Sequence, residues 1–224
     1  MRKRGFTLIE LLVVIAIIGV LAAILIPNIL SAIAGSKKTA DATNLKRLVE
    51  QYMAGQAQAK SKKTPKSAGH RFWLALCVGD GPGPGNLEIT GDDDPDQYIG
   101  VGDSAGLFLS PGDSDAMGQD EVKKALQECV EGGSGVTGLQ SSELMCSYAG
   151  PKTPKKNMSD KKGNIVGCNT DRDGASIFDD GFNGVTASGQ ARYYYYREMT
   201  EQYSWPDQVD APQFGSEPLD EVIR

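Results

Sequence analysis

The sequence predicts an α+β protein in which one long, kinked N-terminal helix packs on a small, mainly antiparallel β-sheet head. The first observation is an apolar run near the N-terminus that is too long for a strand. The second is an apolar stripe with helical spacing farther along the chain. The third is a series of short strand-like segments, bounded by glycine and aspartate, in the remainder of the sequence.

The apolar run extends from Phe6 to Ile26, and only Thr7 and Glu10 within it are polar. As a helix these 21 residues would be about 31 Å long, which is enough to cross the hydrocarbon core of a bilayer. The basic cluster Arg2-Lys3-Arg4 comes directly before the run. The positive-inside rule therefore predicts a cytoplasmic N-terminus and an exported remainder.

Two ordinary segments share this pattern, a cleaved secretory signal peptide and a plain single-pass anchor. The signal peptide is disfavoured because no small-x-small cleavage site ends the run, which continues as Ile24-Leu25-Ile26-Pro27-Asn28. The plain anchor leaves Glu10 unexplained, since an unpaired carboxylate in hydrocarbon costs several kcal/mol and usually marks a function.

The segment Gly5-Phe6-Thr7-Leu8-Ile9-Glu10-Leu11-Leu12-Val13-Val14-Ile15 resembles the class III signal of type IV pilins and type II secretion pseudopilins. Pro27 falls where the helix of that family carries a proline. The resemblance covers about the first 30 residues. It implies that a membrane-embedded prepilin peptidase removes residues 1–5, cutting between Gly5 and Phe6, and methylates the new amine of Phe6.

Glu10 then acquires a role in assembly. A cationic amine at Phe6 in apolar surroundings needs an opposite charge nearby, and Glu10, four residues later, can pair with it within one helix. The resemblance implies a more important pairing with the amine of a neighbouring subunit, which sets the axial register of a filament. We expect Glu10→Ala to leave cleavage intact and to block assembly.

The helix is expected to span residues 6–59, with 6–26 as the transmembrane segment or filament core and Pro27 as a kink. Beyond the kink, an apolar stripe at helical spacing predicts that this half packs on a head formed by residues 60–224. The stripe consists of Leu45, Leu48, Val49, Tyr52 and Met53.

Within the head, residues 60–69 form a basic connection, Arg71–Val78 is a strand or a helix, and Asp120–Glu131 is a helix ended by glycines. The candidate strands are 98–101, 106–109, 143–148, 164–168, 175–178 and 192–199. The segments 141–146 and 174–181 are similar to head signatures of pilin-like families from planctomycetes. Phe182 stands where those families usually carry histidine, so no role of that histidine transfers.

Four cysteines, Cys77, Cys129, Cys146 and Cys168, follow the predicted span and should lie in an oxidising compartment. An even number favours two disulfides, with three possible connectivities, and their spacing fits no zinc pattern. The pair Cys146 with Cys168 is favoured because it closes a shorter loop.

Acidic residues raise the possibility of calcium. Asp171 and Asp173 alternate before the turn residue Gly174, a pattern that suits an oxygen-liganded cation, and residues 92–96 form a second acidic group. A solvated acidic turn is the alternative at both places. No other cofactor is expected.

The net charge of −6 becomes −9 without the three basic residues of the leader, which disfavours a nucleic-acid partner for the head. Two functions remain: a structural filament subunit, of a type IV pilus or a secretion pseudopilus, and a membrane-tethered or filament-tip binding module. Neither is an enzyme. The resemblance implies four kinds of partner: copies of the chain, the prepilin peptidase and methyltransferase, an inner-membrane assembly platform with its motor ATPase, and the membrane. The head would be periplasmic or at the cell surface.

Overall fold

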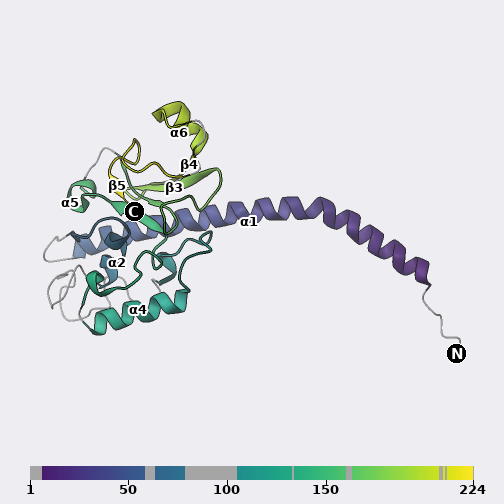
Figure 1. Ribbon diagram of the computed structural model, residues 1–224, viewed down its shortest axis with the longest axis horizontal. Helices are drawn as coiled ribbons and strands as arrows, with labels where there is room; N and C mark the ends of the chain where they lie inside the picture. Colours follow the sequence, from purple (N-terminus) through teal and green to yellow (C-terminus); the bar gives the residue numbers. More distant parts are fainter. Residues whose placement is uncertain are drawn as a thin grey trace. The chain divides into compact units, whose positions relative to one another are not determined.

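The computed structural model describes residues 7–58, 64–78, 105–132, 134–159, 163–206, 209 and 211–223. The chain divides into two units, Met1–Lys37 and Lys38–Arg224, and the second is called the head unit or the head from here on. One helix, α1 (Leu8–Gln58), contributes to both units (Figure 1). The ends expected for it at residues 6 and 59 lie outside the described part of the chain.

In the head unit, α1 buries the face that the apolar stripe predicted. Leu45, Leu48, Val49 and Tyr52 are buried, whereas Met53 is 46% exposed. The charged residues Lys46, Arg47 and Glu50 remain on the solvent side. The buried stripe of α1 is therefore narrower than predicted, because it does not include Met53.

The head contains one five-stranded antiparallel sheet with the order β4-β3-β2-β1-β5. Its strands are β1 (Tyr148–Pro151), β2 (Ile165–Asn169), β3 (Gly181–Thr186), β4 (Ala191–Tyr195) and β5 (Val222–Ile223). A long helix on a small antiparallel sheet is the α+β architecture that the sequence predicted.

The two faces of the sheet carry separate apolar clusters. The larger one joins the stripe of α1 to Tyr148, Val166 and Val185 of the sheet and to two other helices, α2 (His70–Val78) and α4 (Gln119–Glu131). The smaller one gathers Phe182, Trp205 and the C-terminal helix α6 (Tyr196–Tyr203) on the opposite face. Alternation along the strands separates these two sets of side chains.

Close packing fixes α2 against β1. Trp73 of α2 donates its indole N–H to the carbonyl oxygen of Ala149 at 3.0 Å. A Cβ atom on Gly150 would lie 2.2 Å from the carbonyl oxygen of Gly69, and one on Gly167 would lie 2.6 Å from the Trp73 ring. Glycine is therefore required at both positions for the helix to approach the sheet.

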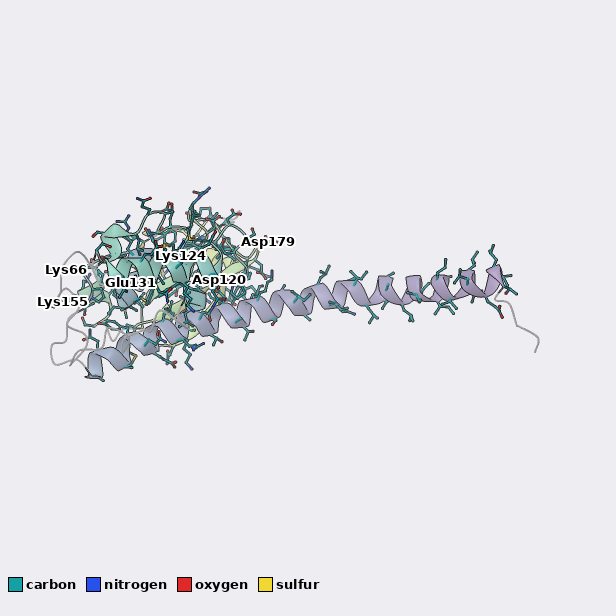
Figure 2. All side chains as sticks on the ribbon, turned by 90° about the horizontal axis from the view of Figure 1, so that it is seen from below. Lys66, Asp120, Lys124, Glu131, Lys155 and Asp179 are labelled. Atoms are coloured by element: carbon teal, nitrogen blue, oxygen red, sulfur yellow. The ribbon has the colours of Figure 1, made fainter. Side chains whose placement is uncertain are left out.

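Several expected elements are confirmed. The segment left open between strand and helix, residues 71–78, is the helix α2, and the helix expected at 120–131 is α4. The strand expected at 164–168 is β2. The exposed face of α4 carries Asp120, Lys124 and Glu131 (Figure 2).

Other expected strands are wrong. Residues 106–109 begin in the 3-10 helix η2 (Ala105–Leu107), 175–178 contribute one isolated bridge at Phe178, and only Tyr148 of 143–148 is in a strand. Residues 192–199 begin as β4 but continue as α6. The strand expected at 98–101 lies outside the described residues. The remaining elements among the described residues of the head are the short helices η3 (Val136–Gly138) and α5 (Pro154–Asn157).

Candidate functional site

The N-terminal half of α1 exposes its apolar side chains on every side. All the leucines, isoleucines and valines from Leu8 to Ile33 are exposed, from 45% at Val14 to 81% at Leu8. Figure 2 shows them projecting around the helix. By length and composition α1 is also the one helix in the described part of the chain that could cross a membrane. Such a surface needs an apolar neighbour, either lipid or other apolar helices.

Thr7 and Glu10 form a reciprocal pair at the start of this helix. Glu10 Oε2 accepts hydrogen bonds from the backbone N–H of Thr7 at 2.8 Å and from its hydroxyl at 2.7 Å. The backbone N–H of Glu10 donates in return to Thr7 Oγ1 at 3.3 Å. This is a capping box, which satisfies donors that the first turn of a helix otherwise leaves open.

The capping box adds a second role for Glu10 that sequence reasoning missed. The signal was present, because Thr7-Leu8-Ile9-Glu10 has the Thr-x-x-Glu spacing of the motif. The expected partner, the amine of Phe6, lies with Gly5 outside the described residues.

The helix continues without interruption through Pro27. Two side chains bond carbonyl groups around it: Ser31 Oγ donates to the carbonyl oxygen of Pro27 at 3.0 Å, and Asn28 Nδ2 donates to that of Ile24 at 3.4 Å. The carbonyl group that loses its helical N–H donor to Pro27 is that of Ala23, so these two bonds add donors to neighbouring carbonyl groups and do not replace the lost one. The kink at Pro27 stays a prediction.

Comparisons with known proteins point to the same N-terminal segment. Residues 1–26 match the prokaryotic N-terminal methylation motif. The type IV major pilin protein PilA of Myxococcus xanthus is 62% identical over 47 residues, which are 21% of this chain and 21% of that protein. A fimbrial protein of Pseudomonas aeruginosa is 33% identical over 96 residues, 41% of this chain and 62% of the relative.

A secretion protein is similar as well. The type II secretion system core protein G of Klebsiella pneumoniae is 52% identical over 40 residues, 18% of this chain and 26% of that protein. The N-terminal segment of this chain is that of the type IV pilin and pseudopilin family. The chain spans between about a fifth and about three fifths of the length of these relatives. No solved structure matches it.

Lys38 connects α1 to the edge of the sheet. Its Nζ atom donates to both carboxylate oxygens of Asp180, at 2.6 and 2.7 Å, and lies 4.3 Å from the centre of the Tyr193 ring. Tyr193 also donates its hydroxyl to Asp180. Partial burial alone would raise the pKa of Asp180, but the hydrogen bonds from Lys38 and Tyr193 outweigh it and leave that pKa below its ordinary value.

A second contact between α1 and the sheet is centred on Asp41, which is fully buried. Asp41 accepts hydrogen bonds from the hydroxyl of Tyr148 at 3.1 Å and from the side-chain amide of Asn183 at 2.8 Å. Burial raises its pKa from 3.8 to about 6, although hydrogen bonds from Ser110, Asn183 and Tyr148 oppose the shift. Asp41 belongs to the head, well beyond the apolar run that ends at Ile26.

Asp41 was also missed from the sequence. Its spacing from Leu45 and Leu48, four and seven residues, places it on the same face of α1 as the apolar stripe. That spacing was the available signal for a buried carboxylate.

The four cysteines lie within the described residues, and the structure has no disulfide among them. Cys146 belongs to the larger apolar cluster and Cys168 to the smaller one, on opposite faces of the sheet. The structure therefore does not show the favoured Cys146–Cys168 pair, which stays a prediction. Cys129 also belongs to the larger cluster, and its thiol donates to the carbonyl oxygen of Gly135 at 2.9 Å. Cys77 is half-buried in α2.

The calcium hypothesis gains no support from the described residues, in which no three His, Cys, Asp or Glu side chains group to hold a metal. Asp171 Oδ1 instead accepts backbone N–H bonds from Asp173 at 2.9 Å and Ala175 at 2.7 Å. Asp173 forms an ion pair with Arg172 at 3.3 Å. These contacts describe an acidic turn, and calcium at this place stays a prediction. The acidic group 92–96 lies outside the described residues.

His70 begins α2, and its Nε2 atom lies 3.1 Å from the hydroxyl of Ser142. Arg71 Nε donates to the same hydroxyl at 3.2 Å. Ser142 is buried, so this pair connects α2 to the neighbouring turn and does not present a nucleophile to solvent.

Proposed function

We propose that this chain is a structural subunit of a type IV pilus or of a type II secretion pseudopilus. In this proposal it is cut between Gly5 and Phe6, methylated at Phe6 and assembled through its N-terminal helix. The observation that carries the proposal is the bare apolar surface of α1 from Leu8 to Ile33.

The size of that surface limits where the helix is stable. Fully burying a leucine, isoleucine or valine side chain is worth about 1.5 to 3 kcal/mol relative to leaving it in water. Summed over this stretch, transfer of the bare helix into water would cost on the order of tens of kcal/mol. The helix therefore stays in lipid until it can enter an equally apolar bundle of identical helices.

Glu10 supplies the selectivity in this proposal. An amine created at Phe6 is cationic and needs a carboxylate when it leaves the membrane interface. Glu10 is the only acidic residue in the apolar run, so it can pair with the amine of its own chain or of a neighbour. Pairing with a neighbour rewards one axial offset between subunits, because only that offset brings both charges together.

The other partners follow from the family. They are a prepilin peptidase that also methylates, an inner-membrane platform with its motor ATPase, and the membrane that holds the subunit before assembly. We place the N-terminus in the cytoplasm and the head in the periplasm or at the cell surface, because basic residues precede the span. The proposed role is structural and not enzymatic, by analogy with the major pilin, the fimbrial protein and the secretion core protein to which the chain is similar.

The test is expression of the full-length chain in a host with a type IV pilus or type II secretion apparatus, followed by shearing of surface filaments. Mass spectrometry should find N-methylated Phe6 as the first residue, and cryo-EM should show the helices bundled at the filament axis. A chain that keeps Met1 and stays monomeric in the bilayer would refute the proposal.

Abundance distinguishes the filament subunit from a tip-located binding module. A major subunit should dominate the sheared fraction, whereas a tip protein should be nearly absent from it.

A further inference from the structure

Asp41 places a carboxylate between α1 and the sheet where no solvent reaches it. It is fully buried, and it occupies the same helix face as Leu45 and Leu48. Assembly through the bare N-terminal half of α1, Leu8 to Ile33, gives this residue no role. A buried ionisable group is stable only if its neighbours satisfy its charged form or if it takes up a proton.

The neighbours of Asp41 are neutral donors. Tyr148 of β1, Asn183 of β3 and Ser110 each hydrogen-bond to the carboxylate. Asn183 is fixed in orientation because its amide group donates to the carbonyl oxygen of Lys38 at 2.8 Å as well as to Asp41. The backbone N–H of Asn183 also donates to Asn169 Oδ1.

The charged groups near Asp41 do not neutralise its carboxylate. Among the described residues, none of the ion pairs includes Asp41. From its own helix, Lys38 directs its ammonium group to Asp180. From the segment before β1, Asp113 adds a second negative charge, which disfavours ionisation of Asp41. The sheet contributes two neutral donors to Asp41, the phenol of Tyr148 and the amide of Asn183.

Asp41 can take up a proton, and the hydroxyl of Tyr148 still has a hydrogen-bond acceptor. The hydroxyl of Tyr148 lies 3.1 Å from Asp41 Oδ1 and 3.4 Å from the carbonyl oxygen of Leu109. When Asp41 is ionised, the phenol donates to it. When Asp41 is protonated, its own hydroxyl can donate to the phenol oxygen, and the phenol can turn its hydrogen toward Leu109.

We propose that Asp41 is a proton-operated latch between α1 and the sheet, which holds residues 38–52 of α1 against the sheet more firmly in mild acid than at neutral pH. This device belongs to the head alone, so it goes beyond filament assembly and does not depend on it.

The direction of the pH dependence follows from the difference between the pKa of Asp41 in the folded head and in the unfolded chain. Burial raises the pKa of Asp41 from 3.8 to about 6, so between these values the folded head holds a proton that the unfolded chain has lost. The stabilisation is complete below pH 3.8 and is lost as the pH rises through about 6. Across this window the unfolding equilibrium constant should rise about 100-fold on account of this one group.

The first experiment measures the protonation of Asp41 directly. Full-length protein in detergent micelles is labelled with ¹³C at its aspartate carboxyl groups, and their infrared or NMR signals are followed from pH 3 to pH 8. We expect one carboxyl that titrates near pH 6, absent from Asp41→Asn and unchanged in Asp120→Asn, which removes an exposed aspartate of α4. If every aspartate titrates near pH 4, the proposal is wrong.

A second variant covers the case in which Asp41→Asn fails to fold, since its new amide would face the donor amide of Asn183. Tyr148→Phe removes one donor from the ionised carboxylate, so the same signal should titrate at a higher pH. A midpoint that Tyr148→Phe leaves unchanged would assign the signal to another residue and overturn the assignment.

The third measurement tests the latch. Hydrogen exchange of peptides covering residues 38–52, corrected for the intrinsic pH dependence of exchange, should slow markedly between pH 7 and pH 5 in the wild type and in Asp120→Asn. In Asp41→Asn this change in exchange rate should disappear. In Tyr148→Phe it should occur at a higher pH, together with the shifted titration of the carboxyl group. Equal protection at both values of pH in the wild type would contradict the latch.

Discussion

Thr7 and Glu10 hydrogen-bond to each other in both directions across the first turn of α1. The carboxylate that the family resemblance assigns to contacts between subunits is thus also a capping residue within its own chain. A single substitution to alanine removes both roles together, so an assembly defect in Glu10→Ala alone does not identify the cause.

Glu10→Gln separates the two roles, because glutamine can complete a capping box but carries no charge. We expect Glu10→Gln and Glu10→Ala both to be cleaved normally and both to be absent from sheared filaments. Only Glu10→Ala should also lose helix stability at its first turn, by about 1 kcal/mol. Glu50→Ala is the matched control, since Glu50 is exposed and pairs only with Lys46 within α1. Filaments of normal abundance from Glu10→Gln would leave the cap as the essential role.

Lys38 should stabilise the head more than an ordinary surface lysine. Its ammonium group pairs with Asp180 and lies over the ring of Tyr193, with only a quarter of the side chain exposed. We expect Lys38→Ala to lower the free energy of unfolding of the head by about 1 to 2 kcal/mol. Lys46→Ala, which breaks an exposed pair with Glu50 at 3.6 Å, should change it by less than about 0.5 kcal/mol.

Tryptophan fluorescence is a suitable probe for this comparison, because Trp73 and Trp205 are the two tryptophans of the chain and both are buried in the head. Equal effects of the two lysine substitutions would show that the contacts of Lys38 add nothing to stability.

Gly150 should tolerate no side chain. A Cβ atom there would lie 2.2 Å from the backbone oxygen of Gly69 and 3.1 Å from the indole nitrogen of Trp73. Because a backbone atom cannot move aside cheaply, we expect Gly150→Ala to lower the free energy of unfolding by about 3 kcal/mol. Gly118→Ala is the control, as the nearest atom to its Cβ is Glu121 Oε2 at 3.7 Å. Thermal unfolding midpoints that match in the two variants would contradict the fit of α2 against β1.

The cysteines offer a chemical test of the two faces of the sheet. Since Cys146 and Cys168 lie in different apolar clusters, we expect no bond between them. Alkylation of the unfolded full-length protein without a reductant, followed by proteolysis and peptide mass spectrometry, should find no peptide pair that joins these two residues. A linked peptide pair lighter by two hydrogens would mean that this part of the fold differs from the structure.

Regular, strongly periodic segments were predictable from the sequence. Apolar residues recur at helical spacing in the stripe of α1 and in α4, which favours a helix. Strand β2 contains β-branched residues, which favour a strand. Strand β3 was missed because Gly181, Asn183 and Gly184 have low strand propensity. Its place is set by packing, since a Cβ atom on Gly184 would crowd Tyr194 and Ile165.

The tyrosine-rich segment shows the opposite error. Residues 192–199 have high strand propensity throughout, yet the chain turns into α6 at Tyr196. Tyr196 packs near Phe182 and Trp205, and Met199 joins the same cluster one turn later. Tertiary burial at helical spacing therefore overrides the local preference, and the partner Phe182 belongs to a different strand, β3.

The node at Asp41 and the contacts of Lys38 have a mechanical consequence. Because α1 is one unbroken helix, a force applied to its N-terminal end is transmitted along its backbone. Lys38 is the first residue of the head unit to bear that force. There the ion pair to Asp180 and the amide bond from Asn183 to the carbonyl oxygen of Lys38 resist the force in parallel with the buried carboxylate. Under tension, α1 should therefore separate from the sheet at this end first, and the force required should be greater in mild acid than at neutral pH.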